Sequence, residues 1–314
     1  MPVELIRSDT HIDFLGRWKI AVGVSLAVLL AGVAGFAVNG LRLGLDFAGG
    51  TEAQVRFATD TDEGAIRDAL SPLQLEGISV VRYGAGHQEF LVKFKGERRV
   101  GNTEPATEIT ARNDRVIAMA EALEANIGKV ELERTEYVGP KVGAELREDG
   151  LEAMGYACVL ILAYLAFRFS ARFAPGAVLA LVHDVFVTAS IWLVFGLEFD
   201  LRVLAALLAI MGYSLNDTII VFDRVRENME RRTTYDLPSV LNESVNQTLS
   251  RTLLTSLTTL ATVLALLFLG GDVIRPFALA MTIGIVVGTY SSIYVASPTL
   301  LWLENRFGDQ AKAS

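Results

Sequence analysis

The stretch LRVLAALLAIMGYSLNDTIIVF, residues 201–222, decides the fold class of this chain. It is longer than the roughly 20 apolar residues that an α-helix needs to cross about 30 Å of hydrocarbon, so it predicts a membrane span. Yet Asp217 lies inside it, next to Asn216. A charge at the centre of a spanning helix costs about 2.5–3.5 kcal/mol on insertion scales, so such residues are by default candidates for function.

The rest of the chain repeats this apolar pattern. Of its 314 residues 52% are hydrophobic, and the mean hydropathy is +0.40, above that of an ordinary soluble domain. Runs of near-spanning length occupy residues 20–38, 151–167, 175–195, 201–222, 253–269 and 277–303. The first lacks a clear A-x-A cleavage site and is too long for a signal-peptide core, which favours an uncleaved anchor. We expect a polytopic α-helical membrane protein with six transmembrane helices.

Basic residues in the short loops predict the orientation of these spans. One side carries Arg7, Arg17, Lys19, Arg168, Arg172, Arg224, Arg226, Arg231, Arg232, Arg306 and Lys312, and the other side carries only Arg202 and Arg275. Because positive charge favours the cytoplasm, both termini, 1–19 and 304–314, are expected there. The expected order is helix 1 at 20–40, an outer domain at 41–150 and helices 2–6 at 151–303, with a cytoplasmic loop at 223–250.

The outer segment 41–150 holds 20 acidic and 14 basic residues, so it carries −6 of the formal charge of −8. That balance argues against nucleic-acid binding. Cys158 is the only cysteine and lies in the second apolar run, so no disulfide can form within the chain. The segment must fold on its own core, for which about 110 residues suffice.

The outer segment is predicted to contain strand, helix, strand, strand, helix and strand. Strands are indicated by the alternation in TEAQVRFA (51–58), ISVVRYG, EFLVKFK and KVELERTEYV (129–138), and helices by DEGAIRDAL (62–70) and residues 108–126. This order is that of a ferredoxin-like α+β domain. It has no phosphate loop, nucleophile elbow or metal-spaced His/Cys set, and His87 alone in a turn is best explained as a solvated residue. We expect no catalytic chemistry, cofactor or metal.

The fifth span opens with a polar stripe of Arg251, Thr255, Thr258 and Thr262, which lie within about 60° of one another on a helix. Such a face should contact other helices or water rather than lipid. Since spans four and five meet the same side of the membrane, Arg251 and Asp217 are expected at similar depth, paired directly or through water. The alternative is a fixed ion pair that only sets helix packing.

The third span adds His183 and Asp184, roughly 12–14 Å from its start. Histidine changes its charge near neutral pH, and a buried carboxyl group can take up and release a proton between states that differ in solvent access. Packing or helix capping is the alternative explanation for this pair. Gly284 and Gly288 form a small-xxx-small pattern, which predicts close helix packing.

Five motifs are spread over almost the whole chain. They are LDFAGGT (45–51), EYVGPKVG (136–143), HDV (183–185), GYSLNDTIIVFDRVREN (212–228) and SVNQTLSRTLLTSLTT (244–259). Together they resemble the motifs of the SecD/SecF family of the bacterial Sec translocon. The long fourth-span motif, which continues into Asp223, Arg224, Arg226 and Glu227, is the most specific of them.

The resemblance implies a periplasmic ferredoxin-like domain and six spans related to those of the RND superfamily, in a bacterial inner membrane. It implies a SecD partner that supplies six more spans, and a pair that uses the proton-motive force to complete export after SecA has inserted preproteins through SecYEG. YajC and YidC are further partners in this setting, beside the preprotein and the lipid. In the family, the residues corresponding to Asp217 and Arg251 matter for proton passage. With Asn216, Thr255, His183 and Asp184 they form the expected relay.

The motifs beside the first and second spans are the expected coupling points between domain and membrane. They comprise Asp46, Phe47, Gly49, Gly50, Thr51, Gly139 and Pro140. Gly49 and Gly50 permit tight backbone turns and Pro140 restricts another.

Three rival functions are considered. A passive scaffold that joins SecD to the channel would tolerate a neutral replacement of Asp217. An RND-type exporter of small molecules or lipids fits the layout of spans and outer domain. An intramembrane aspartyl protease would pair Asp184 with Asp217, but SLND lacks the G-x-G-D loop of such enzymes. No residue decides between proton and sodium as the coupling ion.

Overall fold

The structure is a computed structural model that describes the chain except for residues 1–9, 84–85, 96–104, 169–172, 234 and 308–314. The expected cytoplasmic termini thus lie partly outside the described residues. The chain divides into two compact units. A membrane unit comprises Met1–Arg42, Glu152–Glu198 and Arg202–Ser314, and an α+β unit comprises Leu43–Leu151 and Phe199–Leu201.

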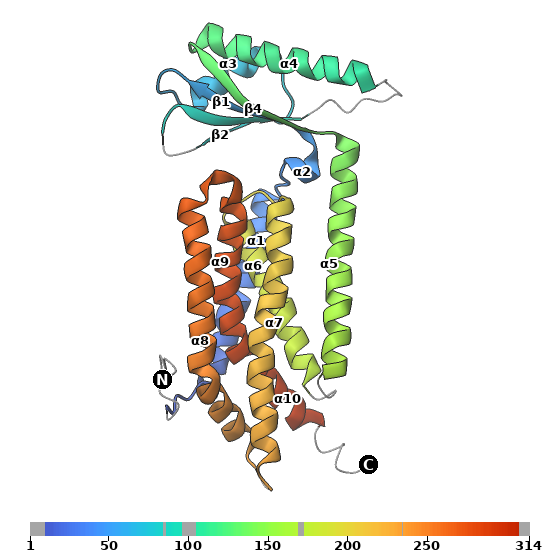
Figure 1. The fold of residues 1–314 in the computed structure, drawn as a ribbon, viewed down its shortest axis with the longest axis vertical. Coiled ribbons are helices and arrows are strands. Elements are labelled where there is room, and N and C mark those ends of the chain that lie inside the picture. The colour runs from blue at the N-terminus through green and yellow to red at the C-terminus, as the bar shows by residue number, and fades with distance from the viewer. Residues whose placement is uncertain (1–9, 84–85, 96–104, 169–172, 234, 308–314) are drawn as a thin grey trace. The chain divides into compact units, whose positions relative to one another are not determined.

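Six helical segments are long and apolar enough to cross a membrane, which confirms the six predicted spans. They are built from α1 (Trp18–Asn39), α5 (Pro140–Arg168), α6 (Ala174–Val194), α7 (Leu201–Glu230), α8 (Leu237–Leu269) and α9 (Gly271–Ser291), labelled in Figure 1. The last span does not run as one regular helix. A π-helical turn, Ser292–Ala296, joins α9 to α10 (Ser297–Phe307).

The segment 223–250, predicted to be a cytoplasmic loop, is mostly helical. α7 continues to Glu230 and α8 already begins at Leu237, behind the N-cap Asp236, whose carboxylate accepts a hydrogen bond from the Ser239 amide at 3.2 Å. Capping by an aspartate and a proline within the first turn are ordinary helix-start signals. The cytoplasmic location of this segment stays a prediction, and its helices were not predicted because hydropathy alone finds spans and overlooks an amphipathic extension.

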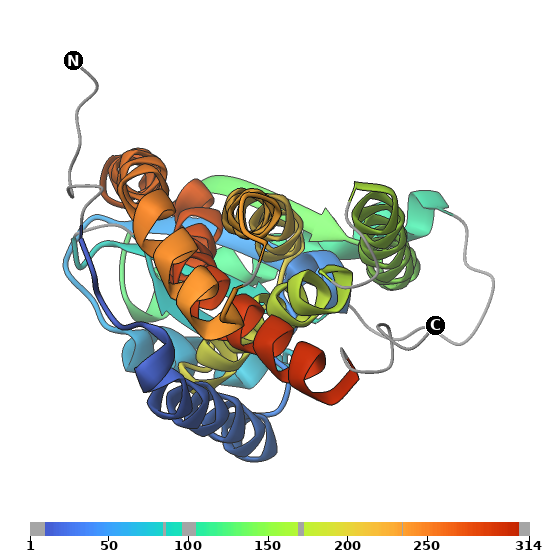
Figure 2. The same ribbon diagram turned by 90° about the horizontal axis from the view of Figure 1, so that it is seen from below.

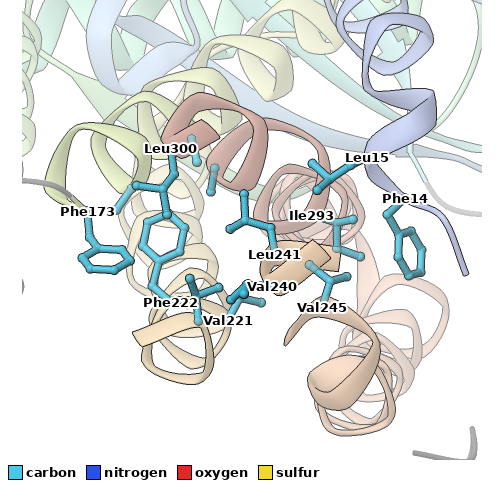
Figure 3. Close-up of a cluster of buried hydrophobic side chains, with 14 of the residues drawn as sticks. Phe14, Leu15, Phe173, Val221, Phe222, Val240, Leu241, Val245, Ile293 and Leu300 are labelled. Carbon is cyan, nitrogen blue, oxygen red and sulfur yellow. The ribbon is translucent and has the colours of Figure 1, made fainter. Parts of the chain in front are cut away.

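A buried apolar cluster holds these extensions together (Figure 3). It includes Phe14, Leu15, Phe173, Val221, Phe222, Val240, Leu241, Val245, Ile293 and Leu300. Phe222 on α7 is fully buried, and its ring lies 5.6 Å from that of Phe173. The cluster therefore anchors the end of α7 and the start of α8, the two helices that carry Asp217 and Arg251.

Glycines permit the close packing of neighbouring spans. α1 packs along α6 and α8 along α9 (Figures 1 and 2). A Cβ at Gly32 of α1 would lie 2.3 Å from the Ser190 side chain of α6, and one at Gly284 of α9 would lie 2.2 Å from Ile210 of α7. No larger residue fits at either place without a shift. The prediction of close packing at Gly284 is confirmed.

The α+β unit has the predicted ferredoxin-like order of elements. These are β1 (Gly50–Phe57), α3 (Glu63–Leu70), β2 (Ser79–Arg82), β3 (Glu89–Phe94), α4 (Pro105–Asn126) and β4 (Val130–Val138). The strands pair antiparallel in the order β2-β3-β1-β4. The alternating strand residues Val55, Phe57 and Phe90 meet Met119 and Leu123 of α4 in the buried core.

The short helix that precedes the sheet was not predicted. The motif LDFA forms a single helical turn, α2 (Leu45–Ala48), immediately before β1. It is closed by Gly49, whose φ of +70° is in the region that favours glycine. The turn is too short to have a periodic signature in the sequence.

Candidate functional site

Asp217 lies on α7 and is 1% exposed. Its Oδ2 accepts a long hydrogen bond of 3.4 Å from the Ser256 hydroxyl of α8, and its Oδ1 has no hydrogen-bond partner among the described residues. The Ser256 hydroxyl also accepts a bond of 3.1 Å from Tyr213 and lies 2.7 Å from the Thr289 hydroxyl of α9. The carboxyl group is therefore buried and weakly bonded to one hydroxyl, that of Ser256, which links it to the hydroxyls of Tyr213 and Thr289.

The structure does not show the direct form of the expected pair between Arg251 and Asp217, and a pair through water stays a prediction. Its side chain is exposed, and among the described residues no ion pair joins it to Asp217. Thr255, partly buried, donates its hydroxyl to main-chain oxygens of α8, those of Arg251 at 3.1 Å and Thr252 at 2.9 Å. The predicted stripe thus lies on the surface of the membrane unit, and the neighbouring face with Thr252 and Ser256 is the buried one.

Asn216 is also exposed, although the adjacent Asp217 is buried. Thr258 and Thr262 complete an exposed polar surface, and both hydroxyls bond to main-chain oxygens of their own helix. Polar groups on a spanning helix favour contact with other protein over contact with lipid. These exposed polar groups, Asn216 on α7 and Arg251, Thr258 and Thr262 on α8, are therefore suited to contact with a partner helix.

A second buried carboxyl group, that of Asp184 on α6, is fully hydrogen-bonded. It is 0% exposed. Its Oδ1 lies 2.9 Å from His183 Nδ1, and its Oδ2 accepts hydrogen bonds from the hydroxyls of Ser291, at 2.7 Å, and Ser214. The network therefore joins α6 to both α7 and α9, and it differs sharply from the sparse bonding of Asp217.

His183 extends this network to α1. Its Nε2 lies 2.8 Å from the Ser25 hydroxyl, which lies 3.1 Å from the hydroxyl of Tyr290. Tyr290 donates to the main-chain oxygen of Ala21 at 2.5 Å. One polar cluster thus connects four helices inside the membrane unit.

Sequence reasoning missed most of the groups that serve the two carboxyls. These are Ser25, Tyr213, Ser214, Thr289, Tyr290 and Ser291. All except Ser25 come from consecutive positions, 213–214 on α7 and 289–291 on α9, so neighbouring residues serve different carboxyl groups. Hydroxyls inside spans were the available signal, but such residues are common there and do not reveal their partners. No hydrogen bond joins the two carboxyl groups to each other within the part of the chain that the structure describes.

The predicted coupling residues lie together in the α+β unit. Asp46 of α2 accepts a hydrogen bond of 3.1 Å from the amide of Leu201. A Cβ at Gly49 would lie 2.9 Å from Pro140 Cα at the start of α5, and one at Gly50 would lie 2.7 Å from the Phe94 oxygen. The two glycines are therefore required by close backbone contacts as well as by their positive φ values. The remaining coupling residues are Phe47 and Thr51, both buried, and Gly139, which directly precedes α5.

The polar motif at the end of α7 forms ion pairs. Asp223 pairs with Arg168 of α5 at 2.7 Å and lies 3.8 Å from Arg226. Arg224 donates to Gln247 of α8 and to Glu227, both at 2.6 Å. These contacts tie the end of α7 to α5 and α8. No group of three or more His, Cys, Asp or Glu side chains that could hold a metal ion occurs among the described residues.

Six apolar helical segments and a ferredoxin-like unit after the first of them define the class as a polytopic α-helical membrane protein. The family model "Protein export membrane protein SecD/SecF, C-terminal" matches residues 118–306, and the "SecD/SecF GG Motif" matches residues 34–61. The chain belongs to the SecD/SecF family.

Similar proteins agree with this assignment. The Protein translocase subunit SecF of Magnetococcus marinus is 47% identical over 96% of this chain and 95% of its own, and that of Pseudomonas aeruginosa is 40% identical over 93% and 91%. The crystal structure of SecDF from Thermus thermophilus, described as a translocon-associated membrane protein, has a TM-score of 0.83 and 36% identity. It matches 97% of this chain, which spans 40% of the SecDF chain.

Proposed function

We propose that this chain is an accessory subunit of a Sec preprotein translocase that, together with SecD, uses the proton-motive force to drive or complete protein export across a bacterial inner membrane. It performs no catalytic chemistry of its own. The ferredoxin-like unit is periplasmic and both termini are cytoplasmic, in agreement with the distribution of basic residues. The further partners are the SecYEG channel, YajC, YidC, the translocating preprotein and, indirectly, SecA.

The observation that carries this proposal is the state of Asp217. Its carboxyl group is 1% exposed inside a spanning helix, with one long hydrogen bond and one unpartnered oxygen. A buried charge that is not compensated is costly, and binding a proton removes the charge. Proton uptake at Asp217 therefore changes the electrostatic energy of the packing between α7 and its neighbours. His183 and Asp184 continue the proposed relay toward α1.

The exposed polar surface supports SecD as the partner. Arg251 lies on a predicted spanning helix, where exposure of a guanidinium to lipid is costly. In the fused SecDF protein this chain matches only 40% of the length, so the remaining part is available to cover such a surface. Arg251, Asn216 and Thr255 belong to the fourth-span and fifth-span motifs. They act in the complete relay once the partner helices enclose Arg251.

The test measures preprotein export into inner-membrane vesicles under an imposed proton gradient, with wild type, Asp217→Asn and a control acid, Asp272→Asn, which pairs with Arg275 outside the relay. We expect Asp217→Asn to keep SecD on co-purification and to lose the gradient-driven gain in export, while the control keeps both. A parallel arm with a sodium gradient distinguishes the coupling ion. If Asp217→Asn keeps SecD and the full gain under both gradients, the relay is refuted and the scaffold function replaces it.

A further inference from the structure

The α+β unit includes a short connector between α6 and α7, residues Phe199–Leu201. The connector lies against the segment before α2, although the two are about 155 residues apart in the chain. The amide of Gly44 donates to the Phe199 oxygen at 2.7 Å, and Leu43 forms a parallel β-bridge with Phe199. Asp46 accepts from the Leu201 amide at 3.1 Å. The first and last residues of the connector, Phe199 and Leu201, are thus hydrogen-bonded to the segment 43–46.

The two segments lie so close together that position 44 has no room for a side chain. A Cβ at Gly44 would lie 2.8 Å from the Cβ of Asp200, a residue that is only 4% exposed. On the other side of α2, a Cβ at Gly143 of α5 would lie 3.1 Å from the Gly49 amide nitrogen and 3.3 Å from the Asp46 oxygen. α2 is therefore enclosed between the first turn of α5 and the connector.

Asp46 caps the N-terminus of α7, a role that usually belongs to the residue directly before a helix. Leu201 is the first residue of α7, and the first amides of an α-helix have no acceptor within the helix. A carboxylate near a helix N-terminus satisfies such an amide and interacts favourably with the helix dipole. In this chain the capping carboxylate comes from α2, so the start of α7 is bonded to the motif and not only to its own preceding loop.

We propose that the connector, which includes Leu201 as the first residue of α7, moves with the α+β unit as one body, so that α7 itself passes the effect of proton uptake at Asp217 to that unit. From Arg202 onward α7 belongs to the membrane unit. A shift or rotation of α7 then reaches the α+β unit through Leu201, without passing through the covalent links at Arg42 or α5. Asp46, Gly44 and Leu201 are positioning residues for this transmission, and the inference rests on the proposed proton coupling.

The first test removes the contact from each side, in the complete complex with SecD. Asp46→Leu removes the acceptor, Asp46→Asn keeps an acceptor oxygen of the same reach, and Leu201→Pro removes the donor while suiting a first helical position. We expect amide exchange in the first turn of α7 to accelerate roughly ten- to hundredfold in Asp46→Leu, the range for losing a hydrogen bond to a charged group. Asp46→Asn should stay near wild type. Gradient-driven export should fall in Asp46→Leu and in Leu201→Pro alike, and the double variant should lose no more than either single one.

The second test replaces the hydrogen bond with a covalent one. Leu43→Cys and Phe199→Cys, in a Cys158→Ala background, introduce thiols at bridged positions about 4.8 Å apart, a separation that a disulfide spans. The bridge itself is made by main-chain groups, so the two substitutions preserve it. We expect the oxidised pair to export as well as wild type, and to restore the gradient-driven gain in the Asp46→Leu background until a reductant is added.

Either of two results overturns the inference. One is full gradient-driven export in Asp46→Leu despite accelerated exchange at the start of α7. The other is loss of export on oxidation of the cysteine pair alone, because the connector would then have to separate from α2. If Asp217→Asn abolishes the gain while these variants keep it, the relay stands and this transmission fails. If Asp217→Asn keeps the gain, the proposed function fails first, and the exchange rates still report whether the contact exists.

Discussion

The two buried aspartates of the membrane unit should differ strongly in how much the same substitution, Asp→Leu, changes the free energy of unfolding. Asp184 is hydrogen-bonded to three side chains, those of His183, Ser214 and Ser291, and is 0% exposed. Asp217 is 1% exposed but has a single long hydrogen bond, and one oxygen is unpartnered among the described residues. If the number of hydrogen bonds decides how much each carboxyl group contributes to the free energy of unfolding, Asp184 stabilises the helix bundle and Asp217 does not.

The expected size follows from the number of bonds. Hydrogen bonds between membrane helices contribute about 0.6 kcal/mol each on average and up to about 1.7 kcal/mol. Loss of three such bonds in Asp184→Leu should lower the free energy of unfolding by about 2–5 kcal/mol. Asp217→Leu removes one weak hydrogen bond and also a polar group that is costly to bury. The free energy of unfolding should therefore change by no more than about 1 kcal/mol, and an increase is consistent with this reasoning.

The assay is reversible unfolding of the purified chain by denaturing detergent in bicelles, followed by tryptophan fluorescence. Asp184→Asn and Asp217→Asn serve as matched controls, because an amide keeps an acceptor oxygen and the size of the side chain. Asp184→Asn should lose less than half as much stability as Asp184→Leu. Equal losses for the two leucine variants, or a larger loss at position 217, would refute this reasoning from hydrogen bonds.

Three further outcomes follow from local contacts. Gly284→Ala should lower the free energy of unfolding by about 1–3 kcal/mol through overpacking against Ile210, and Ile210→Ala should relieve part of that loss in the double variant. Asp62→Ala removes the side-chain cap of α3 and should cost about 0.5–2 kcal/mol, measured as faster amide exchange in that helix of the full chain. Asn246→Ala removes an amide that both accepts from the Ile12 nitrogen and donates to the Ile12 oxygen, each at 2.9 Å, so a protease should cut near residue 12 faster while cutting elsewhere stays unchanged.

The spans were predictable because membrane insertion depends on the composition of a contiguous segment. The run 201–222 is apolar and long enough to cross the hydrocarbon of a bilayer, and in the structure it is part of α7. The order of elements in the α+β unit was predictable for a similar reason. Alternation in the strands and the amphipathic helices depend on local sequence, and the observed sheet order β2-β3-β1-β4 is the one that this order of elements implies.

The boundaries of the helices were harder to predict from the sequence. Residues 237–250 belong to α8, although their mean composition resembles that of a loop. Their helicity depends on burial of Val240, Leu241 and Val245 against distant parts of the chain. Tertiary packing supplies most of the stability of such helices, so local sequence underestimates them.

The sequence by itself determined the class of this protein, its six spans, its ferredoxin-like unit and the presence of an ionisable group inside a span, because each of these depends on the order of residues along one segment. Only the tertiary structure decided which side of α8 is buried. Helical spacing gives the angles between side chains but not the direction in which a neighbouring helix lies, so Ser256 contacts Asp217 while Arg251 is exposed. The bond from Leu201 to Asp46 is of the same kind, since it joins residues 155 positions apart that come together only when the chain has folded.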